Sequence, residues 1–326
     1  MAVNDSLAAL SDSAFTASIV TYSVGVVGFA GEYAFGRRGR VARTSSEQTT
    51  VVDGGSNRTD TATVTTSGPG QRLGVVGLAC TVLGAGLQIV SLVLRGVATD
   101  RVPWGNMFEF ASGVVLVTVL SFLWLVWQAP RLRHVGVFVL IPVVFVLVYA
   151  GLKLYADAAP LVAALRSYWL VIHVAAAIIA TGVFMLSFVV TVLYLVRQRY
   201  ERGVIEAGSM PRPVAALGPR LPAAAVLDRL SYRTVAFAFP IWTFAVIAGA
   251  IWAESAWGRF WGWDPKETWA LIAWLVYAGY LHARATAGWK GVKAARINLL
   301  GFFAMTFNFL IVNMVVSGLH SYSGLT

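Results

Sequence analysis

The chain alternates long apolar stretches with shorter polar ones, a pattern typical of a helical membrane protein. A transmembrane helix needs about 20 consecutive apolar residues, and eight stretches of roughly that length are present. They are residues 14–36, 73–94, 107–128, 134–155, 168–196, 234–253, 268–287 and 297–319. We therefore expect an all-α, polytopic membrane bundle of about eight transmembrane helices. An even number of crossings places both termini on the same side.

Basic residues are divided unequally between the two sets of segments that eight crossings define. One set holds 19 of the 25 Lys and Arg residues, and the other holds 6. The smaller set consists of Arg95, Arg101, Lys153, Arg166, Arg259 and Lys266. Because cytoplasmic loops are enriched in Lys and Arg, we expect the larger set to face the cytoplasm. Both termini are then extracytoplasmic, and the protein is a multi-pass protein of the cytoplasmic (inner) membrane.

Composition agrees with this assignment and excludes several functions. The chain has 58% hydrophobic and 12% charged residues and a mean hydropathy of +0.71, far from a soluble domain. In a soluble protein, a net charge of +10 would suggest a nucleic-acid partner. Here most of the positive charge lies in the predicted cytoplasmic loops, so we expect no nucleic-acid partner. The single cysteine, Cys80, excludes an internal disulfide, a relay of two thiols and a CxxCH haem-attachment site within the chain.

Two parts of the chain are expected to differ in role. Residues 1–72 would form a first transmembrane helix, retained because no basic residue precedes it, followed by a flexible cytoplasmic linker. The linker, 44–70, is rich in Ser, Thr and Gly. Residues 73–326 would form the functional membrane domain. The cytoplasmic loop 200–230 contains several prolines, among them Pro211, Pro213 and Pro222, and we expect it to be partly ordered at best.

The stretch WGRFWGWDPKETW, residues 257–269, holds four of the 12 tryptophans together with Asp264, Lys266 and Glu267. Asp264 as N-cap, Pro265 at the first helical position and Glu267 at the third would begin the next helix with a capping box. This pattern predicts a structural role for Asp264 and Glu267, whatever else they do.

The tryptophans allow two interpretations. A belt at the membrane interface explains isolated residues such as Trp252 and Trp289. Trp257, Trp261 and Trp263 instead share a short loop with two glycines, and such a cluster suits the stacking of a large planar ligand. Taken alone, the residues leave both the belt and the ligand platform open.

The four histidines are candidate metal ligands, since imidazole is the usual axial ligand of haem iron and is costly to bury in a membrane. His173 lies near the outer end of the fifth apolar stretch, and His320 lies just beyond the outer end of the eighth. Both flank the tryptophan loop and could form a bis-histidine pair, although interfacial polar residues occupy such positions too. His282 lies roughly 21 Å along its helix from the outer end. His134 lies among arginines, and we expect a structural role.

These residues resemble the WWD family of haem-handling proteins, because the signature WGxxWxWDxxE is matched at every defined position of 257–267. Within it, the chain resembles the CcsA/ResC subunits, also labelled CcsB, of system II cytochrome c maturation. The CcmC relatives are typically shorter bundles and the CcmF relatives much longer, so eight spans favour CcsA/ResC. Further matching segments are PWGNMFE at 103–109, SYWLVIH at 167–173, YLHAR at 280–284 and GLHSY at 318–322.

The resemblance implies that haem b is a non-covalently held substrate. It would enter near His282, move outward and be held between His173 and His320, where the thiols of a CxxCH apocytochrome c add to its vinyl groups. Implied partners are that apocytochrome, a ResB-like membrane subunit supplying a second histidine beside His282, and thiol-reducing proteins as further candidates. No catalytic residue is assigned. The implied haem-binding loop comprises Trp257, Trp261, Trp263, Asp264 and Glu267.

Three functions remain open at this point. The chain could be the membrane subunit of a holocytochrome c synthase, a thioether-forming lyase. It could instead be a haem exporter or carrier that hands haem to another protein, or a transporter of another flat hydrophobic molecule such as a quinone. Arg101, Arg166 and Arg259 could pair with haem propionates, but topology and lipid anchoring explain them equally well.

Overall fold

The computed structural model describes residues 3–47, 68–161, 165–206, 208, 210–286, 288–316 and 318–319, with side chains except over 36–47. His320 and most of the linker 44–70 lie outside the described residues. The described part of the chain is built of helices and contains no β-strand, as the apolar pattern predicted.

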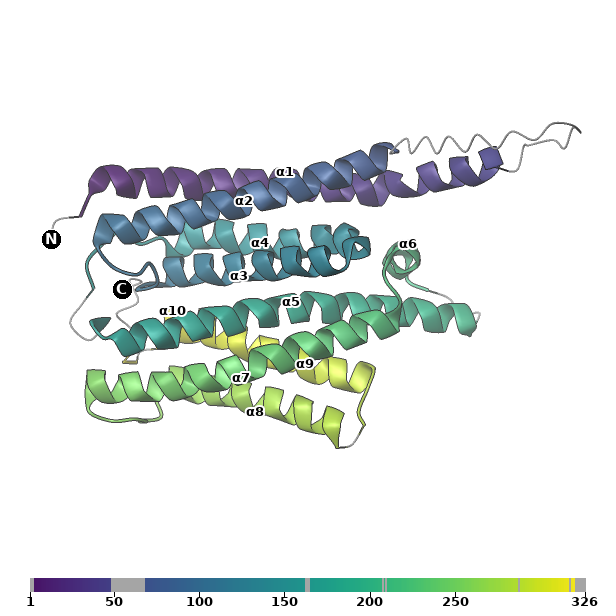
Figure 1. The fold of residues 1–326 in the computed structure, drawn as a ribbon. Helices are drawn as coiled ribbons and strands as arrows, with labels where there is room; N and C mark the ends of the chain where they lie inside the picture. Colours follow the sequence, from purple (N-terminus) through teal and green to yellow (C-terminus); the bar gives the residue numbers. More distant parts are fainter. Residues whose placement is uncertain are drawn as a thin grey trace, which may run out of the picture.

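Each predicted apolar stretch falls largely within a long helix or a run of consecutive helices, and several of the helices extend beyond the stretch (Figure 1). The long helices are α1 (Asp5–Glu47), α2 (Pro69–Thr99), α3 (Met107–Gln128), α4 (Gly136–Tyr149), α5 (Tyr168–Ile205), α7 (Ala224–Trp257), α8 (Pro265–Ala285) and α9 (Val292–Phe307). The short elements are α6 (Arg212–Leu217), α10 (Asn313–Val315), the 3-10 helices η1 (Pro130–Val135) and η4 (Gly218–Arg220), and the π-helices η2 (Ala150–Leu154) and η5 (Asn308–Val312).

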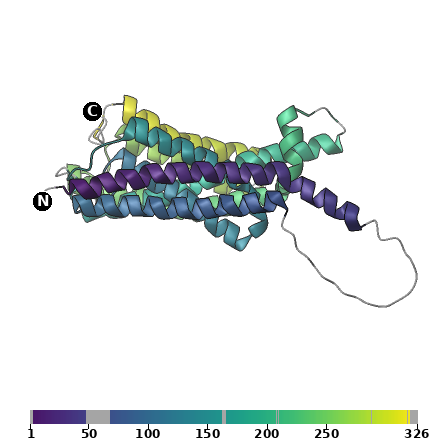
Figure 2. The same cartoon turned by 90° about the horizontal axis from the view of Figure 1, so that it is seen from above.

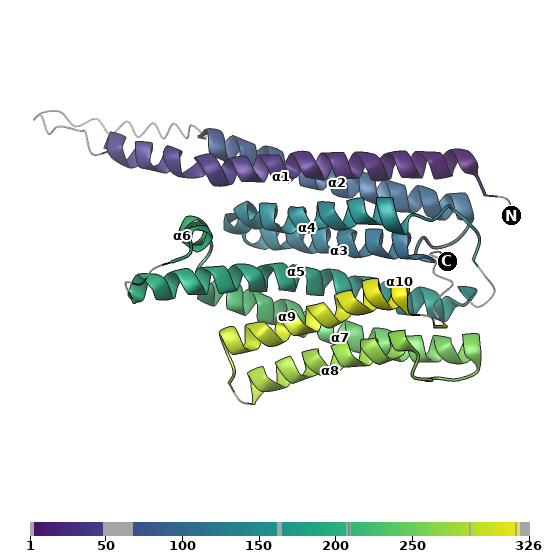
Figure 3. The same ribbon diagram turned by 180° about the vertical axis from the view of Figure 1, so that it is seen from behind.

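Seven helical segments of the described chain are long and apolar enough to cross a membrane, so the protein is a multi-pass membrane protein. The remaining predicted crossing, the seventh stretch 268–287, is α8, which does not meet this criterion because tryptophans, tyrosines, His282 and Arg284 dilute its apolar residues. It nevertheless packs against α7 and α9 within the bundle. The start of α1 and the short α10 lie at the same end (Figure 3). Which side of the membrane this end faces stays a prediction.

Helix α5 is the centre of the bundle, because it belongs to both large apolar cores (Figures 1 and 2). On one side it packs mainly against α3, from which the first core continues to α4, α1 and α2, and on the other side it packs with α7, α8 and α9. Met185 lies in the first core and Phe184 in the second. At the edge of the bundle α1 and α2 approach closely, since a Cβ on Gly28 would lie 2.8 Å from the Cα of Gly77. Small residues permit such backbone contact between membrane helices.

The loop between α5 and α7 is more ordered than expected. Residues 212–220 form α6 and η4, and a guanidinium from α5 holds this segment in place. Nη1 of Arg197 donates to the carbonyls of Gly218 at 2.7 Å and Leu221 at 3.1 Å. Pro213 and Pro219 lie in the first turns of these short helices instead of preventing them, so 212–220 is more ordered than the predicted loop, which was expected to be partly ordered at best.

Candidate functional site

A cavity of about 210 Å³ lies at the end of the bundle where α7 is joined to α8. The segment before α3, the first turns of α5 and α8, the last turns of α7 and the η5 region all contribute to its wall. Sites that enclose a drug-sized ligand usually have about 300–1,000 Å³. A larger planar ligand would therefore be covered over part of its surface, with one edge left outside.

His173 lines this cavity in a defined orientation. Its Nδ1 lies 2.8 Å from the carbonyl oxygen of Ala245 on α7. A carbonyl only accepts, so Nδ1 carries the proton, and in a neutral ring Nε2 holds the lone pair. Metal-binding histidines are commonly oriented by such a bond. Gly249 makes the approach possible, because a Cβ there would lie 2.7 Å from Nδ1.

Trp252 supports His173 from the side. The two rings are stacked, with centroids 6.0 Å apart and planes 10° from parallel, and Trp257 meets Trp252 edge-on at 4.8 Å. Trp252 is only 2% exposed. Its interpretation as a residue of an interfacial belt is therefore wrong, because it lies on the inward face of α7.

The tryptophan loop divides into an inner and an outer part. Gly258, with φ of +70°, ends α7 in the left-handed conformation, and Trp263 has φ of +59°. Trp257 and Trp261 line the cavity, whereas Trp263 is 69% exposed and meets Trp261 edge-on at 5.8 Å. The predicted platform is thus formed by two rings at the cavity, with the third outside it.

The predicted capping box at the start of α8 is confirmed. The Asp264 carboxylate accepts from the amide of Lys266 at 3.1 Å, and the Glu267 carboxylate accepts from the amide of Asp264 at 3.1 Å. Glu267 also accepts from Gly262 at 2.8 Å and pairs with Arg259 at 3.3 Å. Both acidic residues therefore hold the loop in shape, and Glu267 contributes to the cavity wall.

The second oxygen of Asp264 joins the loop to the C-terminal segment. Its Oδ1 accepts from the amide of Leu319 at 2.8 Å, so the chain is held at the loop one residue before His320. His282 lies in the last turn of α8, is exposed, and is not part of the cavity wall. The site thus unites His173, two tryptophans and Glu267, but not His282.

The polar side of the cavity was not foreseen from the sequence. Lys266 lines it, with Nζ 4.0 Å from Sδ of Met107. Lys266 precedes the predicted crossing 268–287, and burial lowers the pKa of its ammonium to about 8. Four other lining side chains have a buried polar atom without a hydrogen-bond partner among the described residues. These atoms are Nε1 of Trp104 and Trp242 and Oδ1 of Asn308 and Asn313.

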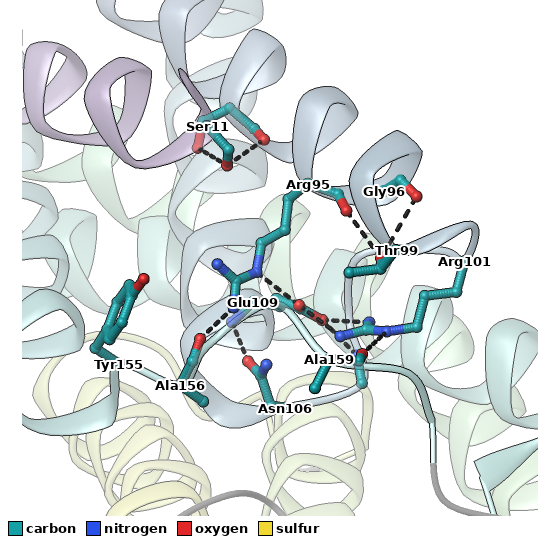
Figure 4. A network of polar contacts seen from close by, with 12 residues as sticks. Ser11, Arg95, Gly96, Thr99, Arg101, Asn106, Glu109, Tyr155, Ala156 and Ala159 are labelled. Carbon is teal, nitrogen blue, oxygen red and sulfur yellow. Dashed lines mark hydrogen bonds and ion pairs between the residues drawn. The ribbon is translucent and has the colours of Figure 1, made fainter. Parts of the chain in front are cut away.

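A buried ionic network holds the segment that precedes α3 (Figure 4). The fully buried Glu109 pairs with Arg95 at 2.7 Å and with Arg101 at 2.8 Å. It also accepts from the amide of Gly105 at 2.7 Å, while Arg95 donates to the carbonyl of Ala156. The network fixes the position of the cavity wall around Gly105.

Comparisons with known proteins agree with this picture. Residues 104–320 match the sequence model of the family described as Cytochrome C assembly protein. The chain is similar to the cytochrome c biogenesis protein CcsA of Guillardia theta, with 35% identity over 77% of this chain and 86% of the relative. Similar proteins of the same name occur in Synechococcus sp. (strain JA-3-3Ab), at 35% identity over 77% and 85%, and in Gloeobacter violaceus, at 33% over 75% and 87%.

Proposed function

The chain belongs to the cytochrome c assembly protein family and acts in cytochrome c maturation, and from this premise we propose that it holds haem b for attachment to apocytochrome c. In this proposal it is the membrane subunit of a holocytochrome c synthase. The observation that carries the proposal is the bond from His173 Nδ1 to the Ala245 carbonyl, because it aligns the ring as a ligand while the ring stacks on Trp252.

The composition of the site fits a large flat metal complex. Neutral imidazole is a ligand of haem iron, and Trp257 and Trp261 offer aromatic surfaces at the same cavity. The family resemblance supplies His320 as the second ligand, and the bond between Asp264 and Leu319 supports a position for it near the loop. A cavity of about 210 Å³ suits a ligand whose reactive edge stays accessible.

The chemistry requires little beyond positioning. Each thiol of the CxxCH motif adds across one vinyl group of haem, so that sulfur bonds to one vinyl carbon and the proton goes to the other. The addition is redox-neutral, and the haem itself supplies the reacting double bond. The chain would orient the haem and exclude unproductive poses. Holding the reactants in the correct geometry removes much of the entropic cost of bringing them together.

Delivery of haem would begin at the opposite end of α8. The exposed His282 offers a ligand to haem in the membrane if a ResB-like subunit supplies the second histidine. Haem would then move outward to the cavity, on the extracytoplasmic face of the inner membrane, where reduced iron is maintained by other proteins.

One reconstitution distinguishes this function from the carrier alternative. The chain is combined in membranes with a ResB-like subunit, haem b, a reductant and a peptide containing CxxCH. Covalent haem on the peptide is the result expected of a synthase. Transfer of haem without thioethers would identify a carrier, and a complex without haem absorption would favour another flat ligand such as a quinone.

The ligand assignment has its own test. His173→Ala and His320→Ala should weaken haem retention and change the absorption spectrum while the bundle stays folded. Added imidazole should restore both in part, since it supplies the same nitrogen donor. His134→Ala is the matched control, as His134 lies in η1 outside the cavity. Wild-type spectra and maturation in both variants would contradict the assignment.

A further inference from the structure

Lys266 is a cation of the cavity wall, and no ion-pair partner for it is found among the described residues. It is the second residue of α8, and its ammonium has Sδ of Met107 at 4.0 Å as its polar contact. A thioether is a weak acceptor. No carboxylate oxygen lies within 4.0 Å of this ammonium in the part of the chain that the structure describes. The neighbouring Asp264 is engaged with the amides of Lys266 and Leu319.

The arginines expected at the same end of the bundle have other partners. Arg101 forms two bonds with the carboxylate of Glu109, and Arg259 pairs with Glu267. Arg166 donates to the carbonyl of Leu161 at 3.1 Å. These contacts make all three guanidiniums parts of the protein framework. Among the described cations that line the cavity, Lys266 is therefore the one for which no carboxylate partner is seen.

Indole donors accompany Lys266 in the cavity wall. Nε1 of Trp104 and Nε1 of Trp242 are buried and have no acceptor among the described residues, and Trp242 is 7% exposed. A buried donor without a partner is costly, so the cavity favours a ligand that brings an acceptor. An ammonium and N–H donors together complement a carboxylate.

We propose that Lys266 binds a carboxylate of the ligand, which in haem is one of the two propionates. This inference rests on the proposed function. It also determines which edge of haem is presented, because the propionates and the vinyl groups lie on opposite edges of the macrocycle. A propionate held at Lys266 inside the cavity directs the vinyl edge outward, towards the thiols of the apocytochrome.

The test compares haem b with its dimethyl ester, in which both carboxylates are blocked while iron and vinyl groups are unchanged. Binding of each to the purified full chain is followed by absorption. A charged hydrogen-bonded pair is worth enough for the wild type to bind haem about tenfold to a hundredfold more tightly than the ester. Lys266→Gln should bind the two equally, and Lys266→Arg should keep most of the preference.

Lys290→Gln is the matched control, because this exposed lysine lies beyond the other end of α8. It should retain the wild-type preference for haem over the ester. A wild-type preference in Lys266→Gln, or no preference in the wild type, overturns the assignment of Lys266 while leaving haem binding intact. Failure of the wild type to bind either compound would instead refute the proposed function itself. Far-ultraviolet circular dichroism establishes that each variant is folded.

Discussion

Replacement of Glu109 by Gln should destabilise the bundle more than loss of any partly exposed ion pair. The substitution preserves the shape of the side chain but removes its charge. Arg95, at 1% exposure, then loses its 2.7 Å partner and keeps the carbonyl of Ala156 and the Asp12 carboxylate at 3.6 Å, while Arg101 loses both of its bonds to the carboxylate.

The magnitude follows from burial. Breaking a buried pair by removing one partner costs about 3–5 kcal/mol, because the remaining charge stays desolvated. We expect about 3 kcal/mol for Glu109→Gln, since Asp12 compensates in part. The matched control is Glu201→Gln, which breaks the pair with Arg197 where the two side chains are 19% and 35% exposed. Exposed pairs contribute about 1 kcal/mol or less.

Unfolding in mixed micelles, followed by circular dichroism and tryptophan fluorescence, measures both variants. A double variant, Arg95→Met with Glu109→Leu, should lose less stability than the sum of the two single losses, because Arg95 is no longer left as an unpaired charge and only Arg101 loses its carboxylate. Equal free energies of unfolding for Glu109→Gln and Glu201→Gln would refute the argument. So would a double variant whose loss equals the sum of the single losses.

Two further predictions concern the topology and the C-terminal segment. A reporter fused after Thr326 should be active only outside the cytoplasm, as the distribution of Lys and Arg predicts; a cytoplasmic signal would overturn the sidedness of the site. Gly318→Ala should weaken haem retention and maturation, because a Cβ there would lie 2.8 Å from Oδ1 of Asp264. Gly279→Ala, with open space around the added Cβ, should have no such effect, and equal behaviour of the two variants would contradict the prediction.

Apolar length predicted where the helices lie but not where they end. The helix α7 begins at Ala224, ten residues before the apolar stretch 234–253, because charged residues extend it into the loop. There Asp228 pairs with Arg284 of α8 at 2.8 Å. Because the two partners are distant in sequence, no local sequence pattern predicts their contact.

In the site, too, local features could be predicted from the sequence, whereas contacts between residues distant in sequence could not. The capping box between Asp264 and Glu267 is local, and its spacing predicted it. The stacking of Trp252 on His173 joins two helices, and the π-helix that begins at Asn308 has no sequence signature. Arg95 was assigned to an outer loop from its place at the end of an apolar stretch, yet tertiary pairing with Glu109 buries it.

The bond between Asp264 and Leu319 has a consequence for biosynthesis. The ribosome adds Leu319 55 residues after Asp264, when the tryptophan loop has already been made. A nascent chain that ends before α9 contains the tryptophan loop but not Leu319, whose amide bonds to Asp264 in the finished protein. The order of synthesis therefore delays formation of this bond until the last helices of the chain have been made.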